Sequence, residues 1–99
     1  MPNTYKIVWS NKAVKGFENI IKYISDNFSK KNTNKFISDF EDFIAIIETQ
    51  PKVFPKTKKV NNIRRIIINK LTSVTYTIKK DTVKIITVYD NRTNNRTNN

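Results

Sequence analysis

The spacing of apolar residues changes at Pro51 in this chain of 99 residues. From residue 11 to Pro51, apolar side chains recur every three or four residues, which is the period of an amphipathic helix. After it, β-branched and aromatic side chains alternate with polar ones, which is the period of a strand with one buried face. Patterns in this order predict an α+β protein whose helices cover one face of an antiparallel sheet.

The first helix is predicted over residues 11–27. Ser10 or Asn11 suits its N-cap, because a short polar side chain can accept from the free backbone N–H groups there. Gly16 lies off the apolar stripe and is expected only to weaken the helix. The stripe is formed by Ala13, Phe17, Ile20, Ile24 and Phe28.

A polar break at residues 29–32 separates this helix from a second one, so the two are expected to form a helical hairpin. The second helix should stop near Thr49, since Pro51 disfavours helical geometry at the residue before it. Its apolar stripe is Phe36, Phe40, Phe43 and Ile47.

Strands are predicted at residues 5–9, 63–69, 73–79 and 83–89, with the last two joined by a turn around Lys80 and Asp81. The two prolines of residues 51–59 favour an ordered loop there. The element order is therefore βααβββ, a helical hairpin on one face of a small antiparallel sheet. Residues 1–93 are expected to form a single domain, and the polar residues 94–99 to be a disordered tail.

Positive charge is concentrated in the second half of the chain. Residues 1–50 carry seven Lys and six acidic residues, a net charge of +1, whereas residues 51–99 carry eight Lys and four Arg but only Asp81 and Asp90, a net charge of +10. This asymmetry predicts a basic surface, made by one part of the fold, that meets an anionic partner.

The composition also restricts the chemistry. The sequence contains neither Cys nor His, so disulfides, thiolate metal sites and the commonest general base are excluded. We expect no metal site and no cofactor. No apolar run has the roughly 20 residues of a membrane span, and the N-terminus does not resemble a signal peptide. We therefore expect a cytoplasmic protein.

Several short motifs, taken in order, resemble the RelE/ParE superfamily of toxins from type II toxin–antitoxin systems. They are Ser10-x-x-Ala13 after the first strand, the stretch from Ile20 to Ile24, Pro51 and Pro55, Arg64-Arg65, Tyr76-x-Ile78, and the ending Tyr89-Asp90-Asn91-Arg92. The resemblance covers residues 4–93 and agrees with the fold predicted from the apolar pattern.

The resemblance implies a toxin that a cognate antitoxin neutralises, so a hetero-oligomer with that antitoxin is expected. ParE-like members inhibit DNA gyrase and are not nucleases, whereas RelE-like members cut messenger RNA on the ribosome. The Asp90-Asn91-Arg92 ending favours the ParE-like function. A RelE-like mRNA interferase, which would be a metal-free endoribonuclease, is the alternative, and a non-enzymatic basic nucleic-acid-binding protein is a second alternative. Whether the chain is an enzyme stays open.

If the chain is RelE-like, the resemblance assigns its catalytic groups to Arg65, Arg64, Lys52, Lys56 and Tyr89. Adjacent strand residues point to opposite faces, so at most one of the two arginines can serve such a site. Tyr76 lies in phase with Val74 and Ile78 and is more simply explained as a core residue. The simpler interpretation of Tyr89 is a strand-end aromatic that closes the core.

Contacts to a partner or to nucleic acid are expected from Lys58, Lys59, Arg64, Arg65, Asp90 and Arg92. One further feature favours a bound partner. The strand at 63–69 has apolar residues on both faces, with Ile67 on one and Ile68 on the other, although helices can cover only one of them. Some apolar surface should therefore remain exposed for an antitoxin, which would add a helix or a strand there. A homodimer through this surface, or a bent strand buried on both faces, is the alternative.

Overall fold

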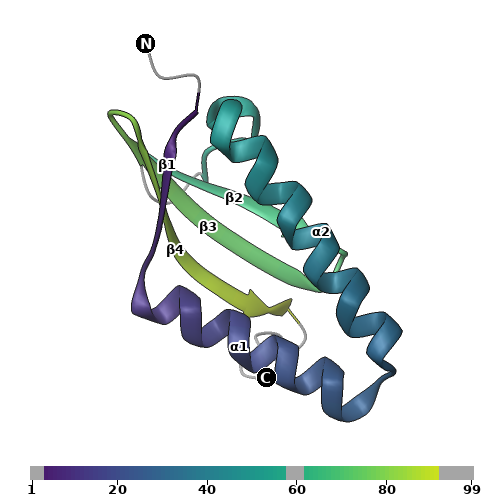
Figure 1. Cartoon of the computed structure of the whole chain (residues 1–99). Helices are drawn as coiled ribbons and strands as arrows, with labels where there is room; N and C mark the ends of the chain where they lie inside the picture. Colours follow the sequence, from purple (N-terminus) through teal and green to yellow (C-terminus); the bar gives the residue numbers. More distant parts are fainter. Residues whose placement is uncertain (1–3, 58–61, 92–99) are drawn as a thin grey trace.

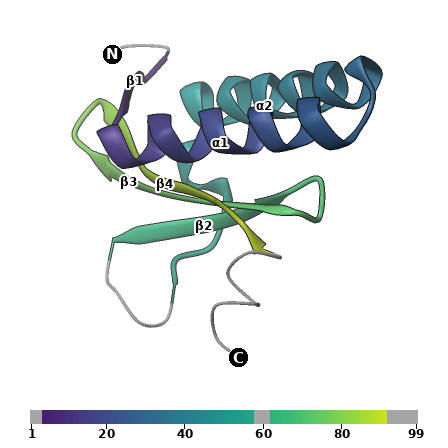
Figure 2. The same ribbon diagram turned by 90° about the horizontal axis from the view of Figure 1, so that it is seen from below.

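The computed structural model describes residues 4–57 and 62–91. Helices α1 and α2 lie side by side on one face of a four-stranded sheet (Figures 1 and 2). This arrangement confirms the predicted βααβββ order and the one-sided α+β fold. The elements are β1 (Lys6–Trp9), α1 (Asn11–Asn27), α2 (Lys30–Thr49), a 3₁₀ turn η1 (Pro51–Val53), β2 (Ile63–Ile68), β3 (Thr72–Lys79) and β4 (Thr82–Asp90).

The order of strands across the sheet is β1-β4-β3-β2. β2, β3 and β4 form an antiparallel meander, but β1 pairs with β4 in parallel, so the sheet is mixed and not purely antiparallel as the sequence suggested. The helical hairpin, β2 and β3 all lie between β1 and β4 in the chain, so this parallel pair has the long connection that it requires. The hairpin returns the chain to the end of the sheet where β1 began, because its two helices run in opposite directions.

Both helices begin at a serine cap. The Ser10 hydroxyl accepts from the Ala13 N–H at 3.0 Å and donates to the Ile86 carbonyl at 2.6 Å, which attaches the start of α1 to β4. Ser29 caps α2 in the same way, and the predicted polar break therefore shrinks to two residues, with α2 beginning at Lys30. Phe28 lies beyond the end of α1 and is 50 % exposed, so it does not continue the buried stripe.

The core lies between the helices and the sheet, and aromatic rings run through it. The rings of Phe17 and Phe40 lie 4.8 Å apart between their centroids, and those of Phe43 and Tyr76 lie 6.0 Å apart. Both helix stripes predicted from the sequence supply this core, as does the helix-facing side of the sheet. Its buried members on the strands are Ile68, Val74, Tyr76, Val83, Ile85 and Val88.

Gly16 has a larger role than the predicted one of weakening the helix. A β-carbon at this position would overlap the carbonyl oxygen of Val88, which is a backbone atom and cannot turn aside. Gly16 therefore allows α1 to lie directly on β4. The prediction was wrong because apolar periodicity does not reveal how closely two backbones approach.

Replacing Gly16 with Ala tests this close approach. Gly→Ala at an exposed helix position usually stabilises by about 1 kcal/mol. Here we expect a loss of about 1–3 kcal/mol in the free energy of unfolding, because α1 must move off β4. Chemical denaturation measures the change. Asn19→Ala on the exposed side of α1 is the matched control and should be neutral or stabilising; a stabilised Gly16→Ala variant would contradict the close packing.

Candidate functional site

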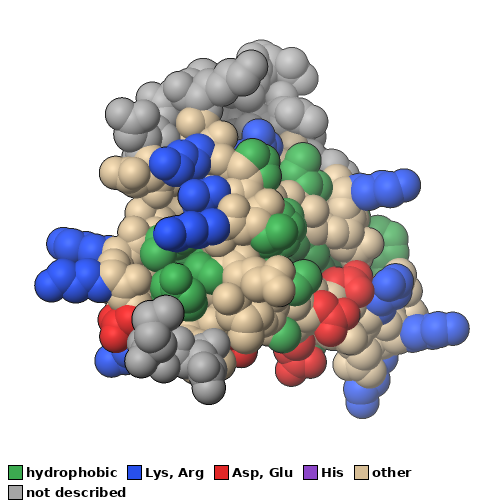
Figure 3. Space-filling view, turned by 90° about the horizontal axis from the view of Figure 1, so that it is seen from above, with side chains coloured by type: hydrophobic (Ala, Val, Ile, Leu, Met, Phe, Trp, Pro, Cys, Tyr) green, Lys and Arg blue, Asp and Glu red, His purple; other side chains and the backbone are tan. Residues whose placement is uncertain are grey.

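The two layers of the fold carry different charges. Six of the eight acidic residues lie on α1 and α2, and the other two are Asp81 in the β3–β4 turn and Asp90 at the end of β4. Residues 49–80 contain no acidic residue at all. On the face drawn in Figure 3, Lys and Arg side chains gather beside apolar ones, and acidic side chains lie in more than one place, some of them next to Lys or Arg side chains. The basic half predicted from the sequence thus corresponds to the sheet and the loop before it.

Arg64 lies on the helix-facing side of β2 and is engaged in structure. It pairs with the core residue Tyr76 across the ladder. Its Nη1 donates to the carbonyl oxygens of Lys52 at 3.2 Å and Phe54 at 2.5 Å. Hydrogen bonds from a charged donor are among the stronger ones in a folded protein. Arg64 therefore holds the η1 segment against the sheet.

Tyr76 holds the same segment from inside the core. Its side chain is fully buried, as predicted, and its hydroxyl donates to the Pro51 carbonyl at 2.6 Å. Burial raises the pKa of Tyr76 from 10.0 to about 12, an effect that the nearby Arg64 guanidinium partly opposes. Arg64 and Tyr76 together bind three carbonyls of residues 51–54, so both residues support the loop that carries the lysines.

Arg65 lies on the opposite side of β2, on the sheet face that no helix of residues 4–57 or 62–91 covers (Figure 2). We call this side the open face. The Arg65 Nη2 donates to the Ser73 hydroxyl at 3.1 Å, and Ser73 donates to the Asn91 side-chain oxygen at 2.5 Å. A guanidinium has five N–H donors, so most of those of Arg65 remain available for a bidentate contact with an anion.

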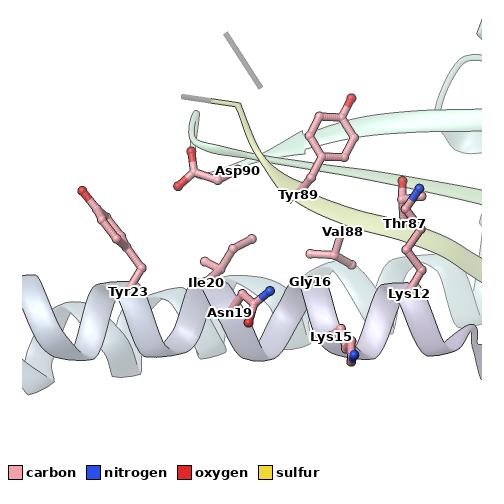
Figure 4. A pocket seen from close by; sticks show the side chains of 10 residues that line it. All are labelled: Lys12, Lys15, Gly16, Asn19, Ile20, Tyr23, Thr87, Val88, Tyr89 and Asp90. Carbon is pink, nitrogen blue, oxygen red and sulfur yellow. The ribbon is translucent and has the colours of Figure 1, made fainter. Parts of the chain in front are cut away.

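Tyr89 also belongs to the open face. It is the ladder partner of Ser73 on β4, and Figure 4 shows its ring pointing away from α1, whereas Val88 points toward the helix. The structure thus places Arg65 and Tyr89 on either side of Ser73. Tyr89 is only partly buried and lies outside the core cluster, so its location differs from the predicted role of closing the core.

The other residues predicted for a site do not join this group. Lys56 forms a bridge with Arg64 and so shares its side of the sheet, because paired residues point the same way. Lys52 is exposed on η1. Asp90 lies beside the buried Thr72 in the ladder and points to the helix side. Lys58, Lys59 and Arg92 lie outside the described residues.

Sequence reasoning missed several residues of the open face and a groove. Lys84, Thr75 and Thr87 extend the open face, with the two threonine hydroxyls 2.6 Å apart. A groove of about 760 Å³ runs between α1 and β4 (Figure 4). Its floor is where Gly16 meets Val88, and the single glycine of the sequence was the one available signal for it. The groove is lined by Lys12, Lys15, Gly16, Asn19, Ile20, Tyr23, Thr87, Val88, Tyr89 and Asp90.

Two kinds of site are not found in the described part of the chain. In residues 4–57 and 62–91, no three acidic side chains lie close enough together to hold a metal ion. In the same ranges, neither helix is both long enough and apolar enough to span a bilayer.

The two neighbouring arginines should differ in their effect on stability. Arg64→Ala removes charged hydrogen bonds to two carbonyls, so we expect a loss of about 2 kcal/mol in the free energy of unfolding. Arg65→Ala removes one bond at an exposed position and should cost less than about 1 kcal/mol. Chemical denaturation of both variants gives the comparison, and a loss as large for Arg65→Ala as for Arg64→Ala would refute the division of roles.

The buried phenol of Tyr76 should make stability depend on alkaline pH. Between pH 10 and about 12 the folded chain keeps this proton and the unfolded chain releases it. Stability from this group is therefore complete below pH 10 and is lost as the pH rises through the folded value. We expect Tyr76→Phe to lower stability at neutral pH, since Pro51 loses its donor, and to flatten the alkaline decline. Denaturation at a series of pH values measures both effects. If the free energy of unfolding of Tyr76→Phe declined above pH 10 as steeply as that of the wild type, the buried phenol would not be the cause of the decline.

Comparisons with known proteins agree with this architecture. Among solved structures, the fold matches a chromosomal ParDE toxin–antitoxin system from P. aeruginosa with a TM-score of 0.74, at 12% identity over 90% of this chain and 98% of that one. A conserved hypothetical protein from Helicobacter pylori matches with a TM-score of 0.55, at 15% identity over 89% of this chain and 96% of that one. A copper-bound mutant toxin from Helicobacter pylori matches with a TM-score of 0.54, at 17% identity over 90% and 97%.

At such low identities these likenesses establish the fold alone, and a comparison with curated proteins gives no match. The sequence itself is more specific. Residues 7–94 match the family model described as the ParE toxin of type II toxin–antitoxin systems. This match spans every helix and strand of the fold, from within β1 to past the end of β4. The chain therefore belongs to the ParE toxin family of type II toxin–antitoxin systems.

Proposed function

We propose that this toxin arrests growth by inhibiting DNA gyrase in the cytoplasm and that a cognate antitoxin neutralises it. Membership of the ParE toxin family supports the toxin role. The structural likeness to a ParDE toxin–antitoxin system supports a partner protein. An acidic antitoxin segment would complement residues 49–80, in which all charged side chains are cationic.

The observation that favours gyrase over RNA as the target is that no acidic side chain of the described residues lies beside Arg65 on the open face. Cleaving RNA without a metal ion requires a group that takes the 2′-OH proton and a group that protonates the leaving oxygen. Neither of the two sheet-side acids lies beside Arg65. Asp90 points to the helix side, and Asp81 is six residues along the chain from Thr75, the ladder partner of Arg65. The strand from Thr75 to Lys79 alone, at about 3.3 Å per residue, spans about 13 Å before the turn that holds Asp81.

Arg64 and Lys56 contribute to this choice as well. Arg64 is engaged with the Lys52 and Phe54 carbonyls, and Lys56 lies on its side of the sheet. Within the described ranges, Arg65 and Tyr89 are thus the two members of the predicted nuclease set that lie on the open face. A basic surface with few acid–base groups suits binding to an anionic or acidic protein complex better than it suits catalysis.

One arrangement favours the RelE-like mRNA interferase as a second candidate. Arg65, Lys84 and Tyr89 all lie on the open face, where an arginine could hold a phosphate and a lysine or tyrosine could exchange a proton. The two functions make different demands on these residues. Inhibition of gyrase requires the shape and charge of the surface, whereas cleavage requires the tyrosine hydroxyl or the lysine amine itself.

The test uses the purified full-length chain with two targets. We expect it to abolish the supercoiling of relaxed plasmid by gyrase and to trap cleaved DNA on the enzyme. Toeprinting on translating ribosomes should show no new cuts in the A site. Tyr89→Phe is the matched variant, since it keeps the ring and removes only the hydroxyl, and it should keep full activity on gyrase. A-site cuts that disappear in Tyr89→Phe, with gyrase unaffected by the wild type, would overturn the proposal in favour of the interferase.

A further inference from the structure

Cations and threonines occupy the open face in three rows that cross the strands. Residues paired in a ladder point to the same side of a sheet, so each row can be followed from one strand to the next. The first row runs from Arg65 on β2 through Thr75 on β3 to Thr87 on β4. The second row consists of Ile63, Thr77, Lys84 and Val8, and the third of Lys79, Thr82 and Lys6. Each row therefore contains a threonine and at least one cation.

No carboxylate lies among these rows in the described strands. Asp90 is the one acidic residue within β1 to β4, and it points to the helix side. Asp81 lies in the β3–β4 turn, at the margin of the third row. Because α1 and α2 carry six Lys and six acidic residues, the net positive potential of the described fold is directed out of the open face. The four cations of the rows are exposed, and they are Lys6, Arg65, Lys79 and Lys84.

The threonines of the rows provide further donors between the cations. The hydroxyls of Thr75 and Thr87 lie 2.6 Å apart, so one of them donates to the other. The hydroxyl that accepts keeps its own proton for another acceptor. Most hydrogen bonds between proteins and DNA go to phosphates and sugars, and Lys, Arg and Thr are among their usual donors. The rows thus combine two kinds of donor that suit a phosphate backbone.

The length of the three rows suits the charge density of a DNA duplex. From the first row to the third, β3 runs from Thr75 to Lys79, which at about 3.3 Å per residue spans about 13 Å. Each strand of a duplex carries one phosphate per about 3.4 Å of its axis, so about 13 Å offers about four phosphates. The cations of the rows are therefore about as many as the phosphates that they can face.

Other ligands fit the rows less well. Proteins that bind single-stranded nucleic acid stack its bases on aromatic side chains. The ring of Tyr89 lies on the open face but outside the three rows, as the partner of Ser73. A protein partner needs apolar anchors near the centre of its interface. Ile63 and Val8 lie instead at the two ends of the second row, on the edge strands β2 and β1.

We infer that the open face binds duplex DNA along its phosphate backbone, with the four cations of the rows facing phosphates and the threonine hydroxyls donating between them. The rows contain no asparagine or glutamine to read the edges of bases, so this binding is independent of sequence. The inference rests on the proposed function in one respect: the duplex we expect is the one that gyrase holds. It adds that the toxin contacts this DNA directly.

Binding of the purified full-length chain to a labelled DNA duplex of mixed sequence, measured by fluorescence anisotropy at several salt concentrations, tests this inference. The logarithm of the affinity should fall linearly with that of the salt concentration, by about 0.9 per phosphate contact. Lys84→Gln should reduce this slope by about 1 and weaken binding, whereas Lys84→Arg keeps the charge and should bind as the wild type does. Lys22→Gln is the matched control, since it removes an exposed Lys from α1, and it should leave the slope unchanged.

A combined variant removes the three lysines of the rows together, as Lys6→Gln, Lys79→Gln and Lys84→Gln. It should bind the duplex at least about tenfold more weakly at low salt. Its midpoint of thermal unfolding should stay close to that of the wild type, because all three side chains are exposed. A loss of slope in Lys22→Gln equal to that in Lys84→Gln would overturn the inference. A higher affinity for single-stranded DNA or for RNA than for the duplex would overturn it as well.

Supercoiling by gyrase separates this inference from the proposed function. Inhibition by the combined variant should require at least about tenfold more protein than inhibition by the wild type, in line with its loss of DNA affinity. Inhibition by a wild type that does not bind free duplex, or full inhibition by the combined variant, would overturn the inference and leave the proposed function intact. Binding of the duplex by the wild type together with normal supercoiling would support the inference and contradict the proposed function.

Discussion

The direct contact between α1 and β4 determines how the helix layer meets the sheet. Gly16 permits this contact, because a β-carbon at this position would overlap the Val88 carbonyl oxygen. The contact places the helical hairpin on one side of the sheet, and Ser10 fixes the start of α1 through the Ile86 carbonyl. The aromatic core then fills the space between the layers, and the other side of the sheet is left without a helix in the described part of the chain.

This one-sided arrangement separates the charges and divides the work of the two arginines. The helices carry six acidic residues and six Lys, so their charges balance, whereas the sheet with its preceding loop has a net positive charge. The pleat turns Arg64 toward the helices, where it holds two loop carbonyls, and turns Arg65 to the open face. Arg64 and Arg65 therefore have different roles, because the pleat of a strand points adjacent side chains to opposite faces.

Much of the fold could be predicted from the sequence because it depends on local patterns. The range of α1 and the end of α2 at Thr49 agree with the structure. The predicted ends of the strands differ from the observed ends by no more than one residue. Features that depend on long-range contacts could not be predicted. They include the parallel β1–β4 pair, the role of Gly16 and the choice between Arg64 and Arg65, since no local pattern shows which backbone or carbonyl a residue will meet.

The same limit applies to the site. The basic half was evident from residues 51–99, and the exposed apolar side of the strand at 63–69 was predicted from its apolar residues on both faces. The hydrogen bonds from Arg65 to Ser73 and from Ser73 to Asn91 could not be predicted, because they join three segments that meet only in the folded sheet. The pairing of residues 55–57 with β2, which ends at Pro55, is likewise a tertiary property.

The proposed function requires that the toxin acts through the open face and not through the helix layer. Growth arrest on induced expression tests this requirement, with soluble protein levels matched between variants. Growth arrest by Arg65→Ala should require an inducer concentration at least tenfold higher than the wild type requires. Lys22→Ala, which removes an exposed cation of α1, should arrest growth as the wild type does. Full toxicity of Arg65→Ala, or its loss in Lys22→Ala, would contradict the claim.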